Sequence, residues 1–190
     1  MYLGICVFNI AIERTYRDQV IVKQQLEYNI EHDALTGTYN RNKTDSLADQ
    51  QNVLINFKAD NSGIIMYDID FFKKVNDTYG HITGDHVLVD VSKNVQSLLN
   101  NDEYLIRWGG EEFIVLVKGS EDEIRQKAEK IRHSVEMLEL PEVSHITISV
   151  GVAIYNGGDY QNTVKCADKA LYFAKNNGRN RVVVYNNAMD

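Results

Sequence analysis

The apolar positions of this chain recur every three or four residues in some stretches and form short continuous runs in others. Helical spacing is found in residues 13–31, 43–57, 88–98, 124–138 and 164–174. Short runs rich in β-branched and aromatic residues occupy residues 63–70, 104–106, 113–117, 145–154 and 181–185. The first pattern is typical of amphipathic helices and the second of strands. The predicted order is helix, helix, strand, helix, two strands, helix, strand, helix, strand.

This order contains a βαββαβ core, which predicts an α+β fold of the ferredoxin-like type, with an antiparallel central sheet, helices on one face and added N-terminal helices. In that topology the strand at residues 63–70 lies beside the hairpin formed by the next two strands. We therefore expect Asp68, near the end of the first strand, to lie close to Glu111 at the tip of the hairpin.

The hairpin tip combines glycine with acidic residues. Gly109 and Gly110 separate the two apolar runs, which predicts a two-residue turn at these glycines because glycine adopts positive φ at little cost. Glu111 and Glu112 follow at once, although glutamate is uncommon in strands. Two interpretations stay open here: a solvated turn, or a ligand pair for a hard cation, which in turn suggests a phosphate.

A second polar group follows the apolar run at residues 63–70. This run predicts a strand buried on both faces, and it ends on Asp68 and Asp70, which a period of two places on the same side. One interpretation is a capping aspartate beside solvated lysines, and the other is a ligand site. The polar stretch 75–84 predicts a loop with the capacity for recognition.

Composition narrows the class of partner. The 190 residues predict one domain with an appendage, and their formal net charge of −7 argues against a nucleic-acid polymer, although not against a small nucleotide held by a metal. Cys6 and Cys166 lack metal-ligand spacing, as expected of a reducing compartment. Residues 1–12 are apolar but too short to span a bilayer, so they are either the end of a membrane helix or the first turns of a packing helix. Residues 13–31 are either a surface helix or a connector that pairs with its copy.

At this point the sequence resembles a known family, the GGDEF-type diguanylate cyclases. The resemblance rests first on Gly109-Gly110-Glu111-Glu112-Phe113, and then on a series of ordered landmarks: Asp33-Ala34-Leu35-Thr36-Gly37, Asn40-Arg41, Asp68-Ile69-Asp70-Phe71-Phe72-Lys73, Asn76-Asp77-Thr78-Tyr79-Gly80-His81, Gly84-Asp85, Ser149-Val150-Gly151, Ala167-Asp168, Lys175 and Gly178-Arg179-Asn180. It extends from about residue 33 to 185. The expected division is a helical connector at residues 1–32 and a cyclase domain at residues 33–190.

The resemblance implies a palm-type nucleotidyl cyclase that converts two GTP into cyclic di-GMP and two pyrophosphates, with two Mg²⁺ or Mn²⁺ ions in each half-site. It implies a homodimer in which each 3′-hydroxyl attacks the α-phosphate held by the other copy. It also implies a cytoplasmic location, and an upstream sensor or membrane segment in the full-length protein.

Roles for individual residues follow from the same resemblance. Asp68, Glu111, Glu112 and the backbone carbonyl of Ile69 would hold the metals, and Glu111 would also accept the proton. Lys73 would neutralise phosphate charge, and Arg107 would lie near the reacting phosphate of the opposing half. The residues implied in substrate binding are Phe71 and Phe72 through their backbone N–H groups, Lys175 and Arg179 at the terminal phosphate, Asn76 and Asp85 at guanine, and His81 at the ribose or base.

One departure from the family pattern carries a prediction. Many members have Arg-x-x-Asp, an inhibitory product site, where this chain has Asn100-Asn101-Asp102-Glu103. Because the arginine is missing, we expect no strong product inhibition there. Three alternative functions stay open: a catalytically silent GTP-binding regulatory module, a palm-type transferase that uses a nucleic-acid strand, and a structural dimerisation domain.

Overall fold

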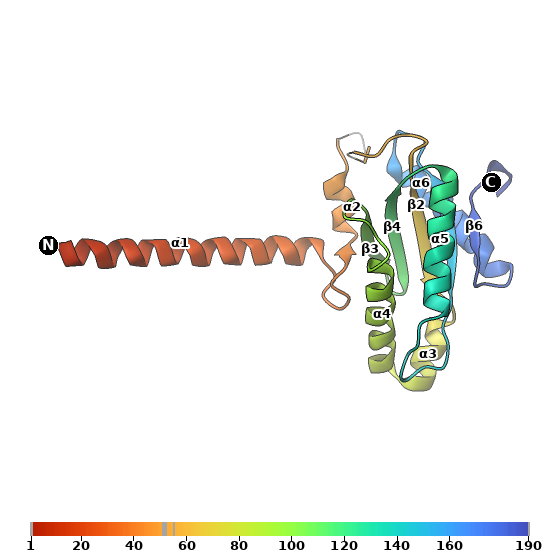
Figure 1. Cartoon of the computed structure of the whole chain (residues 1–190), viewed down its shortest axis with the longest axis horizontal. Coiled ribbons are helices and arrows are strands. Elements are labelled where there is room, and N and C mark those ends of the chain that lie inside the picture. Colours follow the sequence, from red (N-terminus) through yellow and green to blue (C-terminus); the bar gives the residue numbers. More distant parts are fainter. Residues whose placement is uncertain (1, 51–52, 55, 190) are drawn as a thin grey trace.

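The computed structural model describes residues 2–50, 53–54 and 56–189, and within these the side chains of residues 2–12, 24 and 27 are not described. The described residues form a six-stranded sheet flanked by helices, with one long N-terminal helix that projects away from it (Figure 1).

The sheet has the strand order predicted for a ferredoxin-like core. Its four central strands are β2 (Ser62–Ile69), β3 (Tyr104–Gly109), β4 (Glu112–Lys118) and β5 (Ile148–Ile154), arranged antiparallel as β3-β4-β2-β5. Two short strands that pair in parallel extend the edges: β1 (Tyr39–Asn40) beside β3, and β6 (Val182–Val184) beside β5. The predicted fold class is therefore confirmed, while β1 was not predicted.

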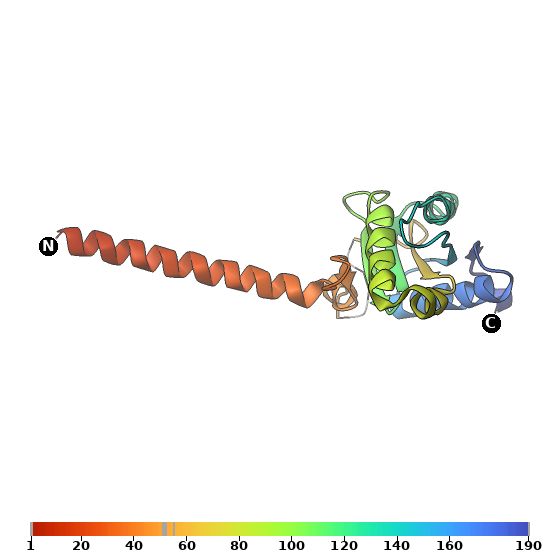
Figure 2. The ribbon, with the colours of Figure 1, turned by 90° about the horizontal axis from the view of Figure 1, so that it is seen from below.

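Helices cover both faces of this sheet. Figure 2 shows α4 (His81–Gln96) and α5 (Glu121–Glu136) on one face and α6 (Tyr160–Asn176) on the other. The prediction of helices on one face is correct for the βαββαβ core, and α6 adds a second layer. All eight residues of β2 are buried, and burial on both faces explains the continuous apolar run from Gly63 to Tyr67 within it.

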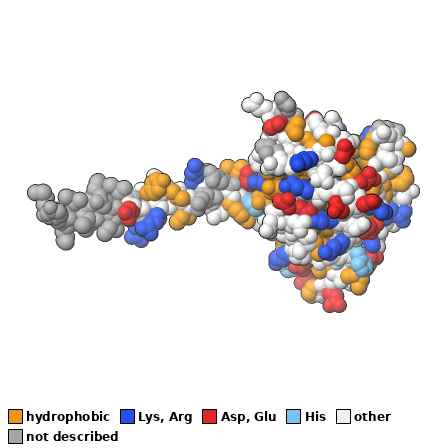
Figure 3. All heavy atoms as spheres, turned by 45° about the horizontal axis from the view of Figure 1, so that its top comes forward, with side chains coloured by type: hydrophobic (Ala, Val, Ile, Leu, Met, Phe, Trp, Pro, Cys, Tyr) orange, Lys and Arg blue, Asp and Glu red, His pale blue; other side chains and the backbone are white. Residues whose placement is uncertain are grey.

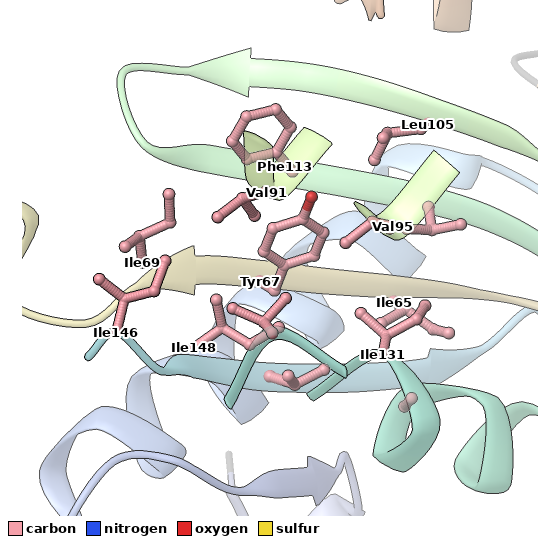
Figure 4. Packing of buried hydrophobic residues seen from close by; sticks show 14 of the residues in the cluster. Ile65, Tyr67, Ile69, Val91, Val95, Leu105, Phe113, Ile131, Ile146 and Ile148 are labelled. Carbon is pink, nitrogen blue, oxygen red and sulfur yellow. The ribbon is translucent and has the colours of Figure 1, made fainter. Parts of the chain in front are cut away.

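The core between β2, β4 and the helices α4 and α5 is tightly filled (Figure 4). The ring of Tyr67 on β2 stacks on that of Phe113 on β4, with ring centroids 5.1 Å apart. Val91 and Val95 of α4 and Ile131 of α5 pack over them. This packing fixes β2 and β4 against each other immediately before the residues predicted to form the site.

The first helix, α1, spans Tyr2–Glu31. The C-terminal end of this helix joins the body of the protein, and its N-terminal end projects away from it (Figures 1 and 2). The helix predicted at residues 13–31 is confirmed as part of it. Val22, Leu26 and Ile30 are all more than half exposed, and Figure 3 shows hydrophobic side chains among charged ones along the described part of this helix. The side-chain amide of Asn40 donates to the carbonyl of Ile30 at 2.8 Å and so ties the helix end to β1.

Within the described part of the chain, no helix is both long and apolar enough to cross a bilayer. The two interpretations of residues 1–12 depend on side chains outside the described set, as does the prediction for Cys6. Cys166 is a free thiol.

The second helix is much shorter than its apolar spacing predicts. The helix α2 spans Asn42–Leu47, whereas the sequence predicts helix to residue 57. At Ala48 the backbone is extended, and its neighbour Asp49 instead accepts a hydrogen bond from the N–H of Val53 at 3.1 Å. Leu54 is buried, and its backbone forms an isolated β-bridge with Ala48. The prediction of helix is therefore wrong for residues 48–50, 53–54 and 56–57, which form an irregular segment, while residues 51, 52 and 55 lie outside the described set.

The polar stretch 75–84, predicted as a loop, is helical. It is the junction of α3 (Phe72–Tyr79) with α4, and Gly80, with φ 86, ends α3 there. Phe72 and Val75 are the buried residues of α3, so only a narrow apolar stripe anchors it. Because the remaining residues are polar, the sequence lacks the wide apolar face from which a helix is normally inferred.

The hairpin turn lies one residue later than predicted. Gly109 belongs to β3 and pairs with Glu112, so the turn residues are Gly110 and Glu111. Gly110 has φ 45 and supplies the positive φ that the turn requires. A register shift between Arg107 and Gly109 accounts for the extra residue. The last described residues form the 3₁₀ turn η1 (Asn187–Met189).

Candidate active site at the end of the central strands

The end of β2 and the tip of the β3–β4 hairpin lie side by side. Asp68 is the register partner of Glu112, and the N–H of Ile69 donates to the carbonyl of Glu111 at 3.4 Å. The topology predicts this proximity, and the structure has it. The arrangement brings three carboxylates from distant parts of the sequence to one edge of the sheet.

Asp68 sits in an environment that opposes its ionisation. Asp68 is only 7% exposed, and burial raises the pKa of its carboxyl to about 6. Glu111 and Glu112 push this pKa in the same direction, while the Nζ of Lys175, 2.7 Å away on α6, opposes the rise. Asp68 is thus a buried acid beside two like charges, with one lysine as counter-charge, and added positive charge would be favourable there.

Asp70, two residues further on, has the opposite environment. Its carboxylate accepts hydrogen bonds from the hydroxyls of Thr147 and Ser149, each at 2.6 Å, and from the N–H of Asn180 at 3.1 Å. These bonds tie the end of β2 to β5 and to the segment after α6. Asp70 therefore serves as a structural acceptor, which corresponds to the capping interpretation.

A cleft of about 390 Å³ opens beside the hairpin tip, between the hairpin and the α3–α4 pair. Seven of the predicted site residues line it: Phe72, Lys73, Asn76, His81, Asp85, Arg107 and Glu111. A close approach of the two helices shapes this cleft at Gly84, where a Cβ atom would lie 1.9 Å from the side-chain oxygen of Asn76. Glycine at this position allows the Asn76 side chain to occupy its place in the cleft.

Arg107 braces the hairpin from within the chain. Its Nη1 donates to Asp33 at 2.9 Å, and its Nε and Nη2 donate to the carbonyl of Gly110 at 3.0 and 2.8 Å. Burial alone would raise the pKa of Asp33, but hydrogen bonds from Thr36 and Arg107 outweigh this and hold it below its ordinary value. Arg107 thus connects the turn that carries Glu111 to the segment directly after α1.

The remaining predicted residues gather outside the lining of the cleft. Asp68 pairs with Lys175, and the guanidinium carbon of Arg179 lies 4.5 Å from the centroid of the Phe71 ring. Ile69 and Glu112 flank this group on β2 and β4. The predicted site therefore has two parts near the hairpin tip. One is the cleft, and the other is the set of residues around Asp68 that contains the two basic side chains, Lys175 and Arg179.

The chemistry of these donors fits a hard divalent cation. In the described part of the chain, no three or more His, Cys, Asp or Glu side chains already converge at ligand distances. The fit rests on the Asp68 carboxyl, whose pKa is raised mainly by burial and further by the neighbouring charges of Glu111 and Glu112. Carboxylate and backbone carbonyl oxygens are the ligands that Mg²⁺ prefers.

The turn at residues 100–103, where the family pattern has a product site, is closed by internal contacts. The N–H of Asn100 donates to the Glu103 carboxylate at 2.7 Å, and Lys127 forms an ion pair with the same buried carboxylate. Lys118 pairs with Asp102 at 2.9 Å. The expected lack of product inhibition stays a prediction.

Comparison with known proteins decides the family. The model of the diguanylate cyclase GGDEF domain matches residues 30–181. The chain belongs to the GGDEF diguanylate cyclase family. The resemblance inferred from the sequence, and the enzyme class that it implies, are confirmed at the level of this family.

Individual members of the family match over most of the chain. Diguanylate cyclase DgcM of Escherichia coli (strain K12) is 35% identical over 176 residues, which are 92% of this chain and 43% of that protein. Diguanylate cyclase A of Treponema denticola is 45% identical over 136 residues, or 68% of this chain and 37% of that protein. The chain thus spans less than half the length of these relatives.

A solved GGDEF structure has the same fold. The coiled coil and GGDEF domain of DgcB from Caulobacter crescentus, in complex with c-di-GMP, superposes with a TM-score of 0.78 at 26% identity. The match covers 93% of this chain and 97% of that one.

Three residues with a clear place in the site received no role from the family resemblance: Asp33, Asp70 and Asn180. Asp33 and Asn180 lie in landmarks that carry the family resemblance, so only their contacts, which join segments far apart in the chain, were missing. Asp70 was noted as half of a charge pair. Its partners Thr147 and Ser149 are ordinary strand residues that give no sequence signal.

Proposed function

We propose that this chain joins two GTP molecules into one cyclic di-GMP and releases two pyrophosphates. The observation that carries the proposal is the meeting of buried Asp68 with Glu111 and Glu112 beside a cleft large enough for part of a nucleotide. Membership of the GGDEF family supports the same reaction.

In each half of the reaction, a 3′-oxygen forms a bond to an α-phosphorus, and the bond from that phosphorus to the bridging oxygen of pyrophosphate breaks. Glu111 would accept the proton of the 3′-hydroxyl, because it lines the cleft at the hairpin turn. Two such steps between the same two nucleotides close the ring. Lys73 on α3, which also lines the cleft, would neutralise charge on the phosphates.

Asp68, Glu111, Glu112 and the backbone carbonyl of Ile69 would hold the divalent ions, Mg²⁺ or Mn²⁺, two in each half-site. When bound, these ions would supply neutralisation of phosphate charge and a lower pKa for the attacking hydroxyl. Lys175, which pairs with Asp68 in this structure, would turn to the terminal phosphate together with Arg179. The backbone N–H groups of Phe71 and Phe72, at the start of α3, would bind the β- and γ-phosphates.

Asn76 and Asp85 would recognise guanine. The Asp85 carboxylate can accept hydrogen bonds from the N1–H and N2–H₂ groups of guanine, and adenine has no such donor pair. His81 would contact the ribose or base. Because unpaired buried polar groups are costly, we expect ATP to be rejected by orders of magnitude.

The reaction needs two copies, because each half-site holds one nucleotide. We propose a homodimer in which residues 1–32 form the connector and residues 33–190 the cyclase domain. Val22, Leu26 and Ile30, exposed along α1, are the residues that would pair the connectors. Arg107 would present charge toward the reacting phosphate of the opposing copy. The setting that fits this proposal is the cytoplasmic side, with an upstream sensor or membrane segment and no nucleic-acid partner.

The test is incubation of the chain with GTP and Mg²⁺, with the products separated and identified by mass. We expect cyclic di-GMP and two equivalents of pyrophosphate, and loss of both in Glu111→Ala at an unchanged melting temperature. GTP binding without a cyclic product would instead support the silent regulatory module. The dimer is tested by dilution, where the rate per enzyme should fall, and a rate that stays constant down to concentrations where the chain is monomeric would exclude it.

A further inference from the structure

We propose that the ring of Phe71 and the side chain of Asn180 position Arg179, so that its guanidinium is held in place before a nucleotide arrives. The inference rests on the proposed function, in which Arg179 contacts the terminal phosphate. It assigns a positioning role to the ring of Phe71 and to the side chain of Asn180, which both act on the substrate through Arg179; the backbone N–H of Phe71 keeps its separate proposed contact with phosphate.

The Phe71 ring lies at the surface of the protein and not in its core. Phe71 is 61% exposed, and its backbone has φ 58, in the left-handed region that a bulky residue seldom adopts. The guanidinium carbon of Arg179 is 4.5 Å from the centroid of this ring. A guanidinium stacked on a ring keeps its N–H edges in the plane of the group, where they can donate to phosphate oxygens.

The backbone of Arg179 is held in an equally unusual conformation. Gly178, Arg179 and Asn180 have φ values of 107, 60 and 42, so two non-glycine residues in succession are left-handed. The left-handed region is unfavourable for residues other than glycine, so the surrounding contacts must compensate for this backbone strain. The N–H of Arg179 donates to the carbonyl of Ala174 at 3.0 Å, which secures one side of the turn.

Asn180 secures the other side through three separate partners. Its N–H donates to Asp70 at 3.1 Å, its side-chain Nδ2 donates to Glu136 at 2.7 Å, and its Oδ1 accepts from Arg132 at 2.7 Å. Arg132 and Glu136 also bond to each other at 2.8 Å on α5. The direction in which Arg179 leaves the backbone is therefore fixed by Asp70, which directly follows β2, and by α5.

This arrangement reduces the entropy that Arg179 loses on binding. An arginine side chain that is free to move loses rotamer entropy when it is immobilised. Here the ring and the turn order it beforehand, although 40% of its side chain remains exposed to an incoming ligand. Holding the group in its bound conformation in advance increases affinity by lowering this cost.

The test compares two nucleotides that differ in the phosphates that Arg179 would contact. Binding of α,β-methylene GTP and of GMP, each with Mg²⁺, is measured by calorimetry for wild type, Phe71→Leu, Phe71→Tyr and Asn180→Ala. We expect Phe71→Leu to weaken binding of the triphosphate analogue about two- to fivefold and to leave binding of GMP unchanged. Phe71→Tyr, which keeps the ring, should bind both nucleotides as wild type does. Asn180→Ala should follow the same pattern with a larger loss. Phe173→Leu, the same change at another exposed phenylalanine, is the matched control.

A double-mutant cycle separates positioning from a general structural effect. In an Arg179→Ala background, Phe71→Leu should have no further effect on the triphosphate analogue, because its target is gone. The inference is overturned if the loss persists in that background, if GMP weakens equally, or if Phe71→Leu changes neither nucleotide. The expected binding pattern with no cyclic product from GTP would leave the inference standing and overturn the proposed function. Cyclic di-GMP synthesis without the pattern would do the reverse.

Discussion

Two groups of carboxylates lie around the end of β2, and they are treated in opposite ways by their surroundings. The site carboxylates, Asp68, Glu111 and Glu112, repel one another, and the pKa of buried Asp68 is raised to about 6. The braced carboxylates, Asp70 and Glu136, are both bonded to Asn180. Hydrogen bonds from Asn180, Arg132 and His133 lower the pKa of Glu136 to about 2.

The difference teaches how a carboxylate that binds a ligand can be told from one that holds the fold. Asp68 and Asp70 are two residues apart, and the sequence gives them the same appearance. The braced group is already supplied with donors, so it has little to gain from a cation. The site group places two half-buried glutamates beside a buried aspartate, and the fold tolerates this cost where a function requires it.

The largest effect that tests this contrast is expected from Asp68→Asn. Synthesis of cyclic di-GMP should fall more than about a hundredfold, because a proposed metal ligand is lost. In the absence of divalent ions at about pH 8, the variant should also melt at a higher temperature than wild type. Product formation and thermal unfolding are the two measurements, and Asp90→Asn on α4 is the matched control.

The sign of the stability change follows from the raised pKa. Because the folded-state pKa of Asp68, about 6, lies above its ordinary value of 3.8, the stability that the protonated form provides at low pH is lost as pH rises through 6. Removing the ionisable group should therefore stabilise the fold above pH 6, by at most about 3 kcal/mol. This gain should disappear below about pH 4. A variant less stable than wild type at every pH would contradict the assignment of Asp68 to the site group.

The next effect concerns the braced group. Asp70→Ala should lower the free energy of unfolding by about 3 kcal/mol, because the hydroxyls of Thr147 and Ser149 and the N–H of Asn180 lose their acceptor. Asp70→Asn keeps one acceptor oxygen and should cost less. Urea denaturation measures both. If Asp68→Ala destabilised the fold as much as Asp70→Ala, the two groups would not differ as described.

The smallest effect is expected from Glu136→Gln, which should lower the melting temperature slightly at neutral pH. Since the pKa of Glu136 is depressed, its contribution is present above 4.5 and is lost as pH falls toward 2. The difference between wild type and variant should shrink over that window. Glu129→Gln removes another acidic partner of Arg132 that does not contact Asn180, and should change less. Equal shifts in the two variants would indicate that the negative charge of Glu136 contributes no more to stability than that of Glu129.

Periodicity was enough to predict the sheet and the long helices, because β2 and α5 each bury a regular apolar pattern. It failed where packing is irregular or local. Leu54 is buried from a segment that is not helical, and α3 is anchored by little more than Phe72 and Val75. The hairpin turn was misplaced by one residue because a bulge beside Trp108 leaves no mark in the sequence.

For the site, topology alone predicted that Asp68 would meet Glu111. The sequence pattern could not predict which polar side chains would form hydrogen bonds within the protein. Arg107 is engaged by Asp33, and Asp70 by two hydroxyls from β5 and its approach, at sequence separations of 74 to 79 residues. Such pairings depend on the completed fold, so they became visible only in the structure.

The most direct test of the central claim is a crystal structure of the chain with Mn²⁺ and α,β-methylene GTP, in which anomalous scattering locates the metal. The account predicts Mn²⁺ about 2.0–2.3 Å from carboxylate oxygens of both Asp68 and Glu111, with the triphosphate on the same ion. A bound nucleotide whose metal contacts neither carboxylate would contradict it.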